Sequence, residues 1–197
     1  SLAPKLLMCI LMVSPPFLTA LGIVREKETG SIFNIYASPV HRGEFLLGKL
    51  APYVAISSLN VVVLWVLATL LFGVPFRGDP LFFFLASILY VSCTTGIGLL
   101  VSLAVRTQIA AMIGTTILTV VPAVLYSGVL IPVSSLSSVA RLVARVLPGM
   151  YFADIAMGSF LKGVGIAALW PDVVALAAYA AVLFTAGYLF FHKRVRA

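Results

Sequence analysis

Five stretches of this chain contain no aspartate, glutamate, lysine or arginine, and each is long enough to cross a lipid bilayer. About 20 helical residues cross the roughly 30 Å hydrocarbon layer. Because backbone amides find no water there, each stretch must satisfy its own hydrogen bonds as a helix. The sequence therefore predicts an all-α, polytopic membrane helical bundle with five spans, at residues 6–24, 50–74, 81–105, 109–131 and 173–191.

The charged residues indicate how such a bundle is oriented. Only 10% of the residues are charged and the net charge is +7, whereas about 25% of the residues in a soluble domain are charged. Eight of the 13 lysines and arginines fall in residues 25–49, 106–108 and 192–197. The positive-inside rule places these segments in the cytoplasm. The charge therefore predicts a multi-pass protein with a cytoplasmic C-terminus and no direct contact with nucleic acid.

One glycine-containing segment raises the question of nucleotide binding. Gly43, Gly48 and Lys49 have the spacing of a phosphate-binding loop, but Leu50 stands where a hydroxyl would hold magnesium. We interpret this segment as the start of a helix. The five apolar stretches also lack histidine and acids, so neither an intramembrane enzyme centre nor an ion-driven carrier is expected. The chain is thus predicted to hold no catalytic, cofactor or metal site, and another domain must bind any nucleotide.

A mixed-charge segment follows the first expected span and leads into a short amphipathic helix. Four apolar side chains fall on one face of this helix: Ile32, Phe33, Ile35 and Tyr36. Pro39 ends the helix, because a proline disfavours helical geometry at the residue before it. The apolar face could lie on the lipid surface, or it could dock in a groove of a soluble partner, for which its aromatic residues are suited.

This region resembles a known family of membrane transporters. Val24–Ile32, Ala37–Val40 and Glu44–Leu50 resemble the corresponding segments of ABC-2 type exporter membrane subunits. The resemblance implies that residues 25–49 form a coupling region that contacts an ABC ATPase, which binds ATP and magnesium. It also implies that two membrane halves pair, as a homodimer or a heterodimer, in the bacterial inner membrane. The residues expected at the ATPase contact are Glu26, Glu28, Gly30, Ile32, Phe33, Ile35, Tyr36, Pro39 and Arg106.

Within that family, two segments narrow the resemblance. Ser31–Tyr36 and Gln108–Ala111 look most similar to the membrane part of bacterial ribosome-associated ATPases, in which ATPase domains precede it in one chain. An exporter of amphipathic or hydrophobic compounds is expected. The alternative is a membrane anchor that holds ATPase domains near ribosomes and moves no cargo. We expect residues 1–197 to form one transmembrane domain, a fragment of a longer protein that lacks the family's first span and extracytoplasmic domain.

Residues 132–172 are too interrupted for a span and are expected to form a pair of short helices on the outer side. Apolar residues recur at helical spacing in the first helix, opposite its two arginines. The family resemblance implies that the pair dips back into the membrane and closes the exit. The alternative is two helices resting in the lipid headgroups. The residues expected at this outer gate are Pro132, Arg141, Arg145 and Pro148.

The polar residues inside the spans are hydroxyls and one amide. The amide of Asn60 is the strongest candidate to face a pathway, because an unpaired amide is costly in lipid. Gly96 and Gly98 are expected to allow two helices to approach closely. A path lined by apolar groups and hydroxyls suits a drug, lipid or glycolipid better than an inorganic ion. The residues expected along the path are Asn60, Thr95 and Thr116.

Overall fold

A computed structural model describes residues 3–31, 39–126, 135 and 137–191 of the chain. These residues form helices and loops, and no strand occurs among them. The α-helices are α1 (Ala3–Glu28), α3 (Arg42–Val66), α4 (Pro80–Ala104), α5 (Gln108–Thr115), α6 (Val121–Tyr126), α7 (Ser138–Val146), α8 (Pro148–Met157) and α9 (Ile166–Phe190). Three π-helical turns extend or join them: η1 (Leu67–Leu71), η2 (Thr116–Val120) and η4 (Gly158–Lys162). The all-α prediction is confirmed for the described residues.

Four helical segments are long and apolar enough to cross a membrane: α1, α3 with η1, α4 and α9. The fifth expected span, residues 109–131, begins in the shorter helical stretch formed by α5, η2 and α6. Residues 127–131 of that expected span lie outside the described part of the chain. The count of five spans therefore stays a prediction.

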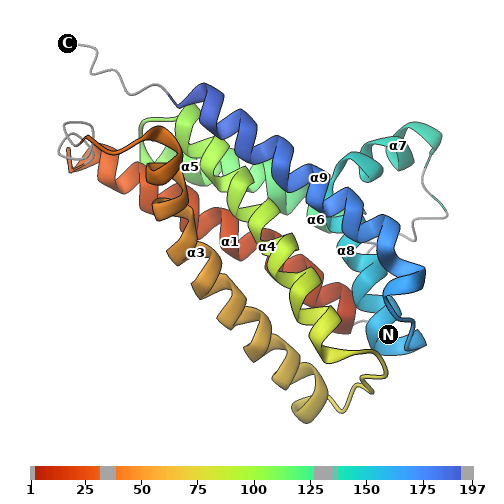
Figure 1. The fold of residues 1–197 in the computed structure, drawn as a ribbon. Helices are drawn as coiled ribbons and strands as arrows, with labels where there is room; N and C mark the ends of the chain where they lie inside the picture. Colours follow the sequence, from red (N-terminus) through yellow and green to blue (C-terminus); the bar gives the residue numbers. More distant parts are fainter. Residues whose placement is uncertain (1–2, 32–38, 127–134, 136, 192–197) are drawn as a thin grey trace.

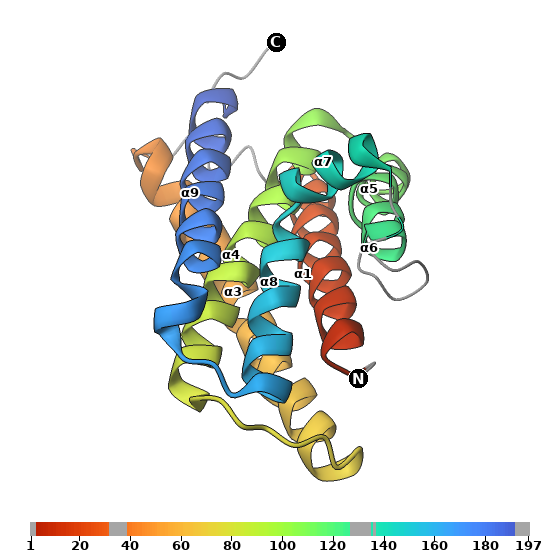
Figure 2. The ribbon, with the colours of Figure 1, turned by 90° about the vertical axis from the view of Figure 1, so that its right-hand side faces the viewer.

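Helix α4 lies at the centre of the bundle, between α9 on one side and α1 on the other (Figure 2). In the most apolar 18-residue stretch of α4, 67% of the residues are buried inside the protein, whereas 17% are buried in the corresponding stretches of α3 and α9. Two glycines permit this close packing, as expected. A Cβ on Gly98 would lie 2.5 Å from the carbonyl oxygen of Pro16 in α1, and a Cβ on Gly96 would lie 3.1 Å from Leu183 in α9. The surfaces of α3 and α9 that remain exposed are suited to lipid.

The bundle has two ends, which differ in chemistry (Figure 1). We call the first the charged end; there α1, α4 and α9 finish and α3 and α5 begin. The ring of Phe45, near the start of α3, stacks on Phe191 at a centroid distance of 4.9 Å and so ties α9 to this end. At the opposite end α1, α4 and α9 begin, and η1 and η4 lie close to the loop between α3 and α4.

Two helices begin before the spans that the sequence predicts within them. The helix containing the second span begins at Arg42, because the Glu44 carboxylate accepts a hydrogen bond (3.2 Å) from the backbone N–H of His41, the N-cap residue. This confirms that the segment beginning at Gly43 opens a helix. The last span was expected at residues 173–191; the helix that covers most of it, α9, begins earlier, at Ile166, and continues through Pro171. Proline removes only one helical hydrogen bond there, and the exposed Ala167 carbonyl can bind solvent instead.

Candidate functional site

The last turn of α1 carries four successive charged residues, and the last three of them each contact a different helix at the charged end. Glu26 contacts α3, Lys27 contacts the end of α4, and Glu28 contacts the start of α5. A helix end leaves four backbone groups without partners inside the helix. Two of these contacts satisfy such groups on neighbouring helices. We call Glu26, Lys27 and Glu28 the charged turn.

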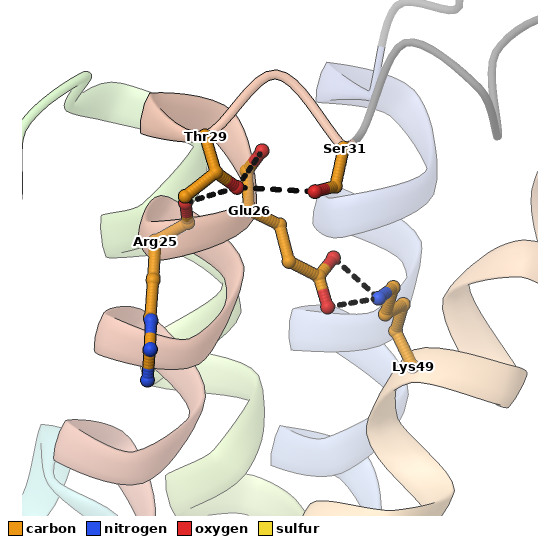
Figure 3. A network of polar contacts seen from close by, with 5 residues as sticks. All are labelled: Arg25, Glu26, Thr29, Ser31 and Lys49. Atoms are coloured by element: carbon orange, nitrogen blue, oxygen red, sulfur yellow. Dashed lines mark hydrogen bonds and ion pairs between the residues drawn. The ribbon is translucent and has the colours of Figure 1, made fainter.

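The first member, Glu26, forms an ion pair with Lys49 of α3 (Figure 3). Both carboxylate oxygens accept hydrogen bonds from the Lys49 ammonium. The side chains are half-buried, with 21% of Lys49 and 30% of Glu26 exposed. In the same view the Arg25 side chain points away from the pair. The pair therefore joins the end of α1 to the first turns of α3, across the segment that was expected to couple to an ATPase.

The second member, Lys27, lies against the C-terminal end of α4. Its ammonium donates a hydrogen bond to the backbone carbonyl of Ser102 and lies 3.4 Å from that of Val105. Carbonyls in the last turn of a helix lack partners within the helix and carry partial negative charge, so a lysine is favourable there. Lys27 thereby ties the end of α1 to the end of the central helix.

The third member, Glu28, lies against the N-terminal end of α5. Its carboxylate accepts hydrogen bonds from the backbone N–H of Gln108 (2.8 Å) and from the Gln108 side-chain amide. Thr107 accepts a further hydrogen bond from the N–H of Ala110 (3.3 Å) and caps the same helix. An acidic group near a helix N-terminus is favourable because the free N–H groups carry partial positive charge.

A backbone turn at residues 29–31 follows the charged turn and continues the coupling region. The Thr29 hydroxyl donates to the Arg25 carbonyl at 3.0 Å and pairs with the Ser31 hydroxyl at 3.1 Å (Figure 3). Gly30 has a φ of 76°, a left-handed conformation that glycine adopts without strain. The expected helix face of Ile32, Phe33, Ile35 and Tyr36 lies outside the described residues. The described part of the chain continues from Pro39.

The remaining residues of the expected ATPase contact surround the charged turn. Pro39 and Arg106 are exposed, in the segment before α3 and in the loop between α4 and α5. An open groove of about 380 Å³ lies beside the ion pair, bounded by residues of α1, α3 and the segment before α3. Its walls include Glu26, Val40, Glu44, Phe45, Lys49 and Tyr53. The charged end therefore presents a concave surface with acidic, basic and aromatic groups.

The three residues expected along a substrate path lie on different helices and are used differently. Asn60 donates from its amide to the Ser14 hydroxyl (3.1 Å) and so joins α3 to α1. Thr95, in α4, is buried and its hydroxyl has no partner among the described residues. Thr116 is exposed in η2 and donates back to the Met112 carbonyl at 2.7 Å. The structure does not gather them into one surface, and their role stays a prediction.

At the opposite end, aromatic rings hold the outer helices. The rings of Phe76, Phe83 and Phe160 contact one another at centroid distances of 5.0 to 5.6 Å, and Tyr90 stacks on Phe152 at 4.2 Å. These rings come from the α3–α4 loop, α4, η4 and α8. They fix the short helices α8 and η4 against the centre of the bundle.

Backbone contacts reinforce this packing. The Ser159 carbonyl in η4 accepts hydrogen bonds from the N–H groups of Arg77 (3.2 Å) and Gly78 (2.8 Å). A Cβ on Gly78 would lie 2.9 Å from the backbone of Ser159. Gly163, which follows η4, has a φ of 62° and leaves no room for a Cβ beside the Arg77 carbonyl. The α3–α4 loop is therefore docked on η4.

The residues expected at the outer gate are placed as follows. Pro148 is buried at the first position of α8, where proline is compatible with a helix start. Arg141 and Arg145 both lie in α7, and Arg145 is exposed. Pro132 lies outside the described residues. Their gating role stays a prediction.

Sequence reasoning missed three members of the charged-end network: Lys27, Lys49 and Gln108. A signal for Lys27 was present, because a lysine in the last turn of a helix is placed to bind carbonyls. It was not evident that those carbonyls would belong to α4. Gln108 was noted only for its resemblance to related proteins, not as a partner of Glu28.

The architecture, a bundle of membrane-spanning helices with a charged network at one end, is that of a multi-pass membrane protein. Comparison with known proteins gives the family: the model described as "ABC-2 family transporter protein" matches residues 1–189. The chain belongs to this family of ABC transporter membrane domains.

Individual relatives agree with the family match. The Escherichia coli K12 protein "Probable multidrug ABC transporter permease YbhS" is 31% identical over 160 residues, 81% of this chain and 42% of the relative. "Probable multidrug ABC transporter permease YbhR" of the same organism is 26% identical over 192 residues, 98% of this chain and 52% of the relative. "Inner membrane transport permease YhhJ", also of Escherichia coli K12, is 25% identical over 184 residues, 90% of this chain and 48% of the relative. The chain spans about half the length of these curated relatives.

Proposed function

We propose that this chain is the membrane half of an ATP-driven ABC-2 exporter and that its charged end receives the ATPase. The observation that carries the proposal is the charged turn, whose three residues contact α3, α4 and α5. A displacement of the segment after Thr29 therefore reaches three helices through side-chain contacts. Such contacts are what a domain without its own nucleotide site needs in order to use movement generated elsewhere.

The surface around the charged turn suits a protein partner. The groove beside the Glu26–Lys49 pair is open, and Pro39 and Arg106 are exposed at the same end of the bundle. Phe33 and Tyr36 would supply aromatic anchors, which often dominate the binding energy of an interface. The ATPase, fused or separate, would hold ATP and magnesium, and this chain would contribute no catalytic group. We place the charged end and the C-terminus in the cytoplasm, with the protein in the bacterial inner membrane.

The opposite end would hold the exit gate. We propose that α7 and α8, with Pro132, Arg141, Arg145 and Pro148, close the exit at rest, and that two membrane halves pair around a path. The path would include Asn60, Thr95 and Thr116. The names of the YbhS and YbhR relatives include the word multidrug, which supports an amphipathic or hydrophobic cargo moved outward.

The test uses the full-length protein with its ATPase, reconstituted in proteoliposomes. Uptake of a fluorescent amphipathic dye should require ATP and should persist when ionophores remove ion gradients. Phe33→Ala with Tyr36→Ala should abolish uptake while membrane insertion is kept, and Leu70→Ala, at a residue that is 81% exposed at the opposite end, serves as the control. Dye uptake driven by an ion gradient in the absence of the ATPase would contradict the proposal.

The alternative function, a membrane anchor that moves no cargo, predicts a different outcome in the same preparation. An anchor for ribosome-associated ATPase domains has no cargo, so amphipathic compounds should leave ATP hydrolysis unchanged and no dye should accumulate. An exporter should instead hydrolyse ATP faster in the presence of at least some compounds. The comparison across a compound panel therefore separates the two functions.

A further inference from the structure

Helix α7 carries an apolar stripe that the described part of the chain leaves exposed. The stripe consists of Val139, Leu142, Val143 and Val146, which are 73%, 64%, 43% and 62% exposed. Their spacing of three and four residues places them on one side of the helix. Among the α7 side chains that the structure describes, Ala144, on another side, is the one that is fully buried. Figure 1 shows α7 projecting from the side of the bundle, near α6.

Another side of α7 carries an exposed arginine that pairs with no carboxylate of the described residues. Arg145 is exposed, and Arg141 precedes it by one helical turn. The sequence contains no aspartate or glutamate between Asp79 and Asp154. In the part of the chain that the structure describes, Arg145 forms no ion pair with a carboxylate. The helix therefore combines an apolar stripe with an exposed Arg145 that no described carboxylate neutralises.

The depth of α7 along the bundle can be estimated from its contacts. Ala144 lines a small cavity together with Met8 and Met12 of α1. These methionines lie in the second and third turns of α1, which begins at Ala3. At 1.5 Å per residue, α7 lies about 8–14 Å from that end of α1. An interfacial helix buries its apolar face about 5–10 Å into the boundary between headgroups and acyl chains, a depth that overlaps this distance when the start of α1 is placed at the membrane surface.

We propose that α7 is an interfacial helix that binds anionic phospholipid. Its apolar stripe lies in the hydrocarbon of the leaflet at the opposite end, and Arg145, with Arg141 one turn before it, binds lipid phosphate. Because Leu147 alone separates α7 from α8, the bound lipid holds the α8 hairpin at a fixed depth. The assignment requires only that the chain spans a bilayer and does not depend on cargo or ATPase.

The position of the stripe is tested with spin labels on the full-length protein in lipid nanodiscs. Cys9 and Cys93 are first replaced by alanine, and single cysteines are introduced at Val139 and Arg145. Val182, exposed on α9, serves as the hydrocarbon standard, and Arg42, exposed at the charged end, as the aqueous standard. The label at Val139 should collide with oxygen as the Val182 label does, and the label at Arg145 should be more accessible to a water-soluble nickel complex.

Two results would overturn this assignment. A Val139 label that resembles the Arg42 label would place the stripe in water. A Val139 label shielded from both reagents would mean that protein, such as a second copy of the chain, covers the stripe.

The lipid preference is tested separately. The protein is purified from membranes containing equal amounts of phosphatidylglycerol and phosphatidylcholine, and the retained lipids are measured by mass spectrometry. Arg145→Gln should lower the retained ratio of phosphatidylglycerol to phosphatidylcholine, by at most about fivefold for one arginine near an anionic surface, and adding Arg141→Gln should lower it further. Arg77→Gln is the matched control, since Arg77 is exposed at the same end of the bundle. Equal ratios in the wild type and the double variant would exclude anionic lipid binding by α7.

Discussion

At the charged end, α3, α4 and α5 are tied to α1 by the charged turn, whereas at the opposite end the α3–α4 loop, α4, α8 and η4 meet through aromatic rings. The contacts of the charged turn are polar and partly exposed; in the Glu26–Lys49 pair, 30% of the Glu26 side chain and 21% of the Lys49 side chain are accessible. At the opposite end, Phe83, Phe152 and Phe160 are fully buried. The two ends of one bundle therefore depend on different interactions.

This difference implies different mechanical properties. Partly exposed ion pairs contribute about 0–1 kcal/mol each and can re-form with other partners. Aromatic pairs contribute about 0.5–1.5 kcal/mol beyond the area that they bury, and their geometry is specific. We therefore expect substitutions at the opposite end to reduce stability, and substitutions at the charged end to reduce coupling with little loss of stability.

The largest stability effect is expected from Phe160→Ala. This side chain is fully buried and contacts the rings of Phe76 and Phe83. Removing it leaves a cavity, so the free energy of unfolding should fall by about 3–5 kcal/mol. Thermal unfolding in detergent would measure the loss, with Phe72→Ala as the control, because Phe72 is 71% exposed. Equal melting temperatures for the two variants would contradict the importance of the ring cluster.

A smaller loss is expected from Gly78→Ala. The new methyl group would meet the backbone of Ser159 at 2.9 Å and disturb the docked α3–α4 loop. Overpacking of this kind costs about 1–3 kcal/mol. Gly165→Ala is the matched control, because a Cβ there meets nothing within 4 Å. If the control is destabilised as much as Gly78→Ala, the loop is not held by this contact.

The smallest effect on stability is expected from breaking the Glu26–Lys49 ion pair. A double-mutant cycle with Glu26→Gln and Lys49→Met should give a coupling free energy of about 0.2–1 kcal/mol. The coupling should decrease as salt is added, because partly exposed charges are screened. A coupling that is independent of salt and several times larger would show that the charged end is as rigid as the opposite end.

Much of the bundle could be predicted from its charge-free stretches, because lipid allows few alternatives to a helix. The spans at residues 6–24 and 81–105 lie within, or within one residue of, α1 and α4. The close packing at Gly96 and Gly98 was predicted because small residues in membrane helices let two helix backbones approach closely. The start of α9 was missed because proline near a helix start is compatible with both a cap and an interior position.

The candidate site was less predictable, because its partners are distant in sequence. The charged segment was recognised, but its contacts with Ser102 and Gln108 depend on how α4 and α5 pack against α1. The residues expected along a substrate path, Asn60, Thr95 and Thr116, were still harder to assign from the sequence. A hydroxyl such as that of Thr116 can bond to its own helix, so its presence in a span does not indicate whether it faces cargo.

The most direct test of the central claim is the number of dye molecules transported per ATP hydrolysed when Lys27 and Glu28 lose their charges. Lys27→Gln with Glu28→Gln, in the full-length protein with its ATPase, should lower this ratio severalfold while the melting temperature and ATP hydrolysis are largely kept. Arg25→Gln, a neighbouring exposed residue whose side chain points away from the Glu26–Lys49 pair (Figure 3), should leave the ratio unchanged. An unchanged ratio in the double variant would contradict the proposal that the charged turn transmits movement to the spans.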